Sequence, residues 1–218
     1  MKSSYYKYFA ALLLFGSNGI VASNINLPSY EIVLLRLLLG SLFLITVFTV
    51  SRQRFTFYRN KHTCLYLFIS ASAMGASWML LYEAYQQVGI SIASLAYYCG
   101  PVIVMILSPF LFRETLTWPK IAGFLTVLAG MCLVNLQALD EGITIWGLFC
   151  GLMSAFMYAL MVTANKKAKP ESGLENSLLQ LVIGSFIVVA FVSMQKNFVL
   201  SLTTIDWIPV LLLGLLNT

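Results

Sequence analysis

Apolar residues recur along the chain in long runs that are separated by short polar segments. Each run is about 20 residues long, the length that a helix needs to cross about 30 Å of hydrocarbon at 1.5 Å per residue. The pattern predicts complete membrane-spanning helices over residues 5–23, 29–50, 63–86, 91–112, 119–137, 145–165 and 177–195. A further run begins near Trp207, but it reaches Thr218 after about a dozen residues, too few to cross a bilayer.

Composition supports a membrane protein. Hydrophobic residues make up 60% of the chain and charged residues 10%, whereas soluble domains carry about 25% charged residues. The net charge of +5 does not indicate nucleic-acid binding, because the basic residues lie in short loops instead of forming a basic face or tail. We therefore expect an all-α, polytopic helical membrane protein that is surrounded by lipid.

The distribution of basic residues predicts the orientation, since cytoplasmic loops of membrane proteins retain Lys and Arg. With the N-terminus in the cytoplasm of a cell-membrane protein, that side collects nearly all of them. They are Lys2, Lys7, Arg52, Arg54, Arg59, Lys61, Arg113, Lys120, Lys166, Lys167 and Lys169. The opposite side has Lys196, and Arg36 lies within a span. An alternative for residues 5–23 is a cleaved signal peptide, because a small-residue stretch ends the run.

Motifs of soluble enzymes are missing from the sequence. It has no HExxH, GxSxG or P-loop pattern. His62 is the single histidine, and the cysteines form no CxxC pair. We therefore expect no enzyme activity, no metal site, no disulfide framework and no cofactor.

The second and seventh predicted spans resemble each other at a constant offset of 144 residues. The offset aligns Glu31 with Glu175, and it aligns the Gly-Ser pair at residues 40–41 with the Gly-Ser pair at residues 184–185. The repeat unit is then five spans long. An odd number of spans inverts the second unit in the membrane, as in many secondary transporters. We expect a first unit over residues 1–137 and an incomplete second unit over residues 145–218.

Residues 93–130 carry a recognisable combination of features. A helix with a central Pro101 is followed by Glu114 at a turn and by a helix that opens with Gly123 and closes on Gly130. Together with Arg36 in the second span, this resembles the EamA-type signature of the drug/metabolite transporter superfamily. The resemblance marks Glu114 and Gly123 as signature positions. A structural role for Glu114, beside an N-cap at Thr117, is the competing interpretation.

The resemblance implies a ten-helix fold of two inverted five-helix halves around a central cavity, of which about seven and a half helices are present here. It also implies a secondary active or facilitative transporter of small metabolites, such as amino acids or drugs, that works by alternating access. The alternative is a non-transporting membrane module that needs a partner to supply further helices. Substrate, direction, coupling and oligomeric state cannot be derived from the sequence.

Arg36 is the first candidate for substrate binding, because a charge near the centre of a span costs about 2.5 to 3.5 kcal/mol unless a partner or a wet cavity offsets it. A structural ion pair, or snorkelling of its side chain to the headgroups, is the alternative. Glu83 on the third span is the preferred partner of Arg36. Glu31 lies about 140° away from Arg36 on the same helix, and we expect it to be solvated in the outer interface.

Polar and aromatic side chains inside the spans are further candidates for a substrate cavity, with ordinary helix packing as the alternative. They are Asn18, Trp78, Tyr82, Tyr97, Tyr98 and Tyr158. Trp78 and Tyr82 share one helix face, because they are four residues apart. Pro101 leaves the carbonyl of Tyr97 without its usual donor and predicts a kink that could serve as a gate. The GxxxG pattern at Gly147 and Gly151 predicts close helix packing.

Overall fold

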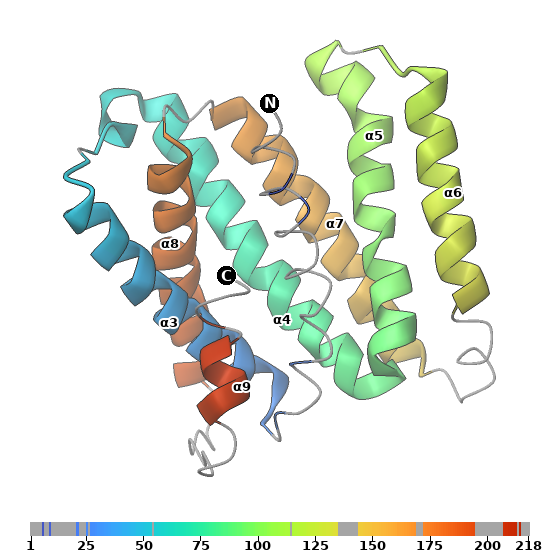
Figure 1. The fold of residues 1–218 in the computed structure, drawn as a ribbon, viewed down its shortest axis with the longest axis horizontal. Coiled ribbons are helices and arrows are strands. Elements are labelled where there is room, and N and C mark those ends of the chain that lie inside the picture. The colour runs from blue at the N-terminus through green and yellow to red at the C-terminus, as the bar shows by residue number, and fades with distance from the viewer. Residues whose placement is uncertain are drawn as a thin grey trace.

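Figure 1 shows the fold as a bundle of helices in a computed structural model. The structure describes residues 6, 9, 21, 25, 27–53, 55–113, 115–134, 144–168, 172–194, 207–212 and 214. Within these residues, the stretches long and apolar enough to cross a membrane are Tyr30–Val50, Lys61–Phe112, Ile145–Ala168 and Gly173–Ser193. The predicted all-α polytopic membrane fold is confirmed. The predicted first span lies almost entirely outside the described residues.

Helices α3 (Ser29–Val50) and α8 (Gly173–Ser193) pack side by side and run in opposite directions (Figure 1). The start of α8 meets the chain just after the end of α3, because Glu175 accepts hydrogen bonds from Thr56 and Phe57. Val33, Leu37 and Val188 have no exposed surface in the core that these helices share. These two helices are the ones that the 144-residue offset relates.

Helices α4 (Lys61–Tyr97) and α5 (Cys99–Phe112) form a hairpin that turns within α4. The first arm is α4 up to the turn, and the second arm is the rest of α4 together with α5. Helix α7 (Ile145–Ala168) packs between the two arms. The chain reverses at Gly89, whose φ of 75° and ψ of 165° are not helical. A Cβ added to Gly151 of α7 would lie 2.8 Å from the Cβ of Ala96 and 3.8 Å from that of Ala84. Since α7 touches the chain both before and after Gly89, the predicted turn between the third and fourth spans is confirmed.

Close contact between α7 and the hairpin depends on small residues. A Cβ at Gly147 would lie 2.5 Å from Val88, so a larger side chain does not fit there. Ser77 and Ser154 each donate a hydrogen bond to the other's backbone carbonyl, at 2.9 and 2.8 Å. The predicted close packing at the GxxxG pattern is therefore confirmed.

The remaining helices refine the predicted boundaries. Helix α6 (Trp118–Val134) occupies most of the predicted fifth span, and α9 (Trp207–Leu211) marks the start of the eighth run. Helix α8 begins at Gly173 instead of residue 177 because Ser172 caps it, accepting a hydrogen bond from the Glu175 amide. A polar cap starts this helix before its apolar run begins.

Basic residues of the five helices α3 to α7, or of their flanking loops, gather at one end of the bundle, which we call the basic end. Its described members with a basic side chain are Arg52, Lys61, Arg113, Lys120, Lys166 and Lys167. The Nζ of Lys166 lies 4.2 Å from the Phe112 ring centroid, and Thr63 donates to the Ala168 carbonyl at 3.1 Å. The turn of the α4–α5 hairpin lies at the opposite end (Figure 1).

The two glutamates related by the 144-residue offset are both buried, each with 3% of its surface exposed. Glu175 accepts bonds from the Thr56 amide, the Thr56 hydroxyl and the Phe57 amide, at 2.5, 2.6 and 2.9 Å. The expectation of a solvated Glu31 is wrong. Residues 31–34 of α3 are all buried, because α4, α8 and α9 pack around the start of this helix.

We predict that Gly89→Ala destabilises the protein by about 1 to 3 kcal/mol, since its backbone conformation is open essentially to glycine alone. Gly123→Ala is the matched control. Gly123 lies within helix α6, where a Cβ would meet nothing within 4 Å, so alanine there should be neutral or stabilising by up to about 1 kcal/mol. Thermal unfolding in detergent checks both, and equal melting temperatures would contradict the assigned turn.

We also predict that Glu175→Ala lowers the melting temperature, because it removes the acceptor for three donors and costs about 1 to 3 kcal/mol. Thr56→Ala should have a smaller effect, since the two backbone amides keep their bonds. Thr46→Ala is the control, because the exposed Thr46 hydroxyl bonds to Leu42 of its own helix. Destabilisation by Thr46→Ala as large as that by Glu175→Ala would argue against this anchor.

Candidate functional site

Arg36 lies on α3 with 2% of its surface exposed. Its Nη1 donates a hydrogen bond to the Tyr82 hydroxyl at 3.0 Å, and its Cζ lies 4.0 Å from the centroid of the Trp78 ring. A guanidinium over an aromatic face is attracted by the ring quadrupole, more strongly when water is excluded. The structure therefore brings together three of the predicted candidates, from two helices.

Further aromatic side chains continue from this contact. The Tyr82 and Tyr85 rings are 5.5 Å apart, and Tyr97 lies 5.3 Å from Tyr158 and 6.2 Å from Tyr98. We call this set the aromatic cluster; its members are Trp78, Tyr82, Tyr85, Tyr97, Tyr98 and Tyr158.

Local sequence explains how these residues converge. Trp78, Tyr82 and Tyr85 follow the spacing of one helix face, and the reversal at Gly89 returns Tyr97 and Tyr98 to the same level of the bundle. Tyr158 reaches them from α7 because Gly100 leaves room for its ring. A Cβ at Gly100 would lie 2.7 Å from the Tyr158 Cδ1 atom.

Pro101 is the third residue of α5, directly after the helix is interrupted at Tyr98. A proline removes the donor for the carbonyl four residues earlier, which is that of Tyr97. The interruption therefore falls within the turn that Pro101 weakens. A gating role for Pro101 stays a prediction.

Glu83 is half-buried and accepts a hydrogen bond from Gln87 at 3.0 Å. It follows Tyr82 and is therefore turned about 100° away from it around the helix. The described contacts of Arg36 are with Tyr82 and Trp78, so its ion pair with Glu83 stays a prediction.

Asn18 and Glu114 lie outside the described residues. Gly123 lies on α6, with open space around it. Sequence reasoning missed Tyr85, although its position three residues after Tyr82 was a usable signal. It also missed a buried hydrogen bond that Gln180 donates to the Ser70 hydroxyl at 2.9 Å. Gln180 is the residue that the 144-residue offset pairs with Arg36.

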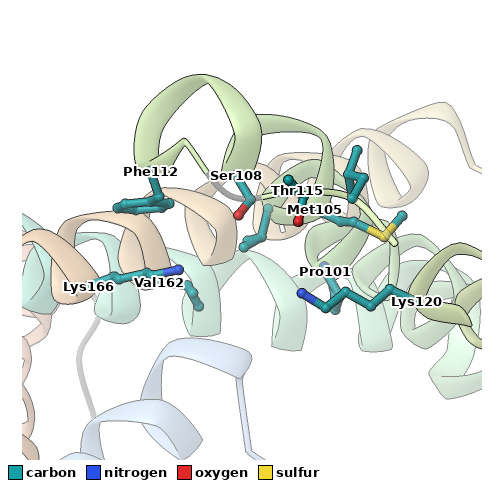
Figure 2. Close-up of a pocket in the computed structure, with 10 residues that line it drawn as sticks. Pro101, Met105, Ser108, Phe112, Thr115, Lys120, Val162 and Lys166 are labelled. Carbon is teal, nitrogen blue, oxygen red and sulfur yellow. The ribbon is translucent and has the colours of Figure 1, made fainter. Parts of the chain in front are cut away.

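A separate pocket of about 260 Å³ lies between α5, α6 and α7 (Figure 2). Pro101 is the one predicted candidate among its lining residues. The other lining residues are Val104, Met105, Ser108, Phe112, Thr115, Leu116, Lys120, Val162 and Lys166. Sequence reasoning did not find this pocket, because its lining depends on how the three consecutive helices α5, α6 and α7 fold against one another.

The Arg36 contact and the aromatic cluster have the chemistry of a binding site. Guanidinium N–H groups donate to carboxylates or other anions, and aromatic faces stack on planar or cationic groups. Ser77 and Ser154 supply hydroxyl groups at the contact between α4 and α7 that lies next to the cluster. The arrangement suits a small organic molecule with one polar and one apolar part.

The chain is similar to known membrane transporters. Residues 3–136 match the EamA-like transporter family. The chain is 26% identical, over 220 residues, to a protein of Bacillus subtilis (strain 168) named "Uncharacterized transporter YxxF"; the alignment covers 97% of this chain and 68% of that protein. No solved structure matches the chain.

The family match covers more than half of the chain and includes Arg36, Trp78, Tyr82 and the Pro101 helix. An ionisable side chain inside a membrane-spanning helix, such as Arg36, is a candidate functional site. The chain therefore belongs to the EamA-like transporter family and is a membrane transporter.

Proposed function

We propose that the protein is a secondary active or facilitative transporter of small metabolites, such as amino acids, drugs or related compounds, and not an enzyme. The observation that carries the proposal is the burial of Arg36 against Trp78 and Tyr82. An arginine within a membrane span is costly and marks a functional site by default. Here the guanidinium contacts two aromatic side chains of α4, and the aromatic cluster extends from there to Tyr158 on α7.

Alternating access between inverted halves is the proposed mechanism, with one half over residues 1–137 and the other over residues 145–218. The antiparallel packing of α3 against α8 supports it, because inverted repeats relate helices in this way. Positions paired by the offset are also buried alike: Ser41 has 6% of its surface exposed and Ser185 7%. Binding sites of such transporters lie near the bilayer midplane, where the two halves meet.

We infer that the basic end faces the cytoplasm of a cell-membrane protein, because positively charged loops resist translocation. Gly89 then lies on the outer side. A substrate bound at Arg36 would then move through the bundle toward the basic end. On the way it would pass the segment where the helix is interrupted at Tyr98, close to Pro101.

Transport by the purified chain tests this proposal. We expect saturable uptake from a mixture of labelled amino acids and other metabolites into proteoliposomes. Arg36→Ala should reduce it by at least about tenfold, because each 1.4 kcal/mol of lost interaction is a factor of ten. Arg36→Lys should be impaired as well, since an ammonium cannot reproduce the planar fork of a guanidinium.

Lys61→Gln is the control for charge removal, since Lys61 is an exposed residue at the start of α4. It should transport like the unchanged protein. Normal flux in Arg36→Ala would show that Arg36 is not in the transport path. No flux from folded, unchanged protein would favour a non-transporting module that needs partner helices.

The Tyr82 hydroxyl should matter for both stability and substrate binding. Tyr82→Phe removes the acceptor of a buried, charged hydrogen bond, so we expect a loss of about 1.5 to 3 kcal/mol in stability and a raised KM in the uptake assay. Tyr66→Phe is the control on the same helix, where Tyr66 lies near Lys167 at the basic end. Equal melting temperatures for the two variants would contradict the importance of the Arg36 contact.

A further inference from the structure

The pocket between α5, α6 and α7 contains two positively charged groups from different helices. Lys120 comes from the first turn of α6 and Lys166 from the last turn of α7. Figure 2 shows both side chains extending toward the same space from opposite sides. Two ammonium groups that converge in this way create a positive potential that attracts an anion.

Hydroxyl groups and an aromatic ring complete the polar part of this pocket. Ser108 and Thr115 line it with side chains that can donate hydrogen bonds to an anion (Figure 2). The Phe112 ring lies 4.2 Å from the Lys166 Nζ and helps to hold that side chain at the pocket. Oxygen atoms of a phosphate group match this combination of ammonium and hydroxyl donors.

The rest of the pocket is apolar, since Val104, Met105, Leu116 and Val162 line it. The outer surfaces of α5 and α6 next to it are apolar too: Phe110 is 82% exposed and Trp118 73%. In a membrane protein such surfaces contact acyl chains and the interface. A ligand here therefore needs an anionic group joined to an apolar part, at the depth of lipid headgroups.

We propose that this pocket binds the phosphate group of an anionic phospholipid between Lys120 and Lys166, with the acyl chains along the exposed surface of α5 and α6. Basic pockets between membrane helices on the cytoplasmic side bind anionic headgroups in this way. The site is distinct from the Arg36 contact, although Pro101 lines the pocket. A bound lipid would brace α6 against α5 and α7.

Native mass spectrometry of the purified protein, titrated with phosphatidylglycerol or phosphatidylcholine, tests the proposal. The protein should retain phosphatidylglycerol preferentially. The double variant Lys120→Gln/Lys166→Gln should weaken this retention by about ten- to thirty-fold, since each lysine near a lipid surface contributes about a factor of five. Lys61→Gln/Lys167→Gln removes the same charge outside the pocket and should leave retention unchanged.

Equal losses in the two double variants would overturn the proposal, because they would indicate diffuse attraction to the basic end. If inorganic phosphate at millimolar concentration displaced the phosphatidylglycerol completely, the pocket would be a site for a soluble anion and the lipid assignment would be wrong. Melting temperatures verify folding. Lys120→Gln alone, at an exposed side chain, should still weaken retention several-fold if the double variant does not fold.

Discussion

A positive charge held inside an apolar bundle is the constraint on which the rest of this structure depends. Removing a guanidinium from water is costly, and here the cost is offset by the face of Trp78 and the hydroxyl group of Tyr82. Both residues lie on α4, so the contact fixes how α4 lies against α3. The same contact also brings the charge beside a row of aromatic rings that extends to α7.

The packing around α7 keeps those rings in place. The reversal at Gly89 allows one helix to be enclosed by two arms, and Gly147 and Gly151 allow the backbones to approach closely. Hydrophobic attraction between helices is weak in lipid, so close packing and buried hydrogen bonds such as those of Ser77 with Ser154 hold the helices together. Another small residue, Gly100, leaves room for the Tyr158 ring, so the packing also determines the shape of the candidate site.

The sequence predicted the spans well, because membrane thickness sets the length of an apolar helix independently of its neighbours. It predicted poorly what depends on neighbours. Glu31 was expected in water because its angle on α3 and its place near the span end were known, whereas the helices around it were not. The start of α8 was missed because a polar cap at Ser172 sets it.

Predictions about the candidate site divide in the same way, into features that one helix determines and features that depend on its neighbours. Residues that are unusual inside a span, such as Arg36 and Trp78, were identifiable from the sequence alone, because burying their charged or polar groups in a membrane span costs free energy. Their partners were not, because pairing requires knowing which helix faces meet. Charge suggested Glu83 as a partner of Arg36, and that ion pair stays a prediction, but charge alone did not indicate the contacts of Arg36 with Trp78 and Tyr82. The pocket of Lys120 and Lys166 depends on how α5, α6 and α7 fold against one another, whereas Tyr85 could have been identified from its spacing to Tyr82.

Accessibility of the Arg36 contact to water-soluble reagents tests the central claim most directly. In a protein whose native cysteines are replaced by alanine, Trp78→Cys should react with a membrane-impermeant thiol reagent, because Trp78 is half-buried beside the proposed cavity. Val188→Cys, at a fully buried core position, should not react. Labelling at position 78 that a transported substrate prevents is the predicted result. An unreactive Trp78→Cys in folded protein would contradict a transport cavity at Arg36.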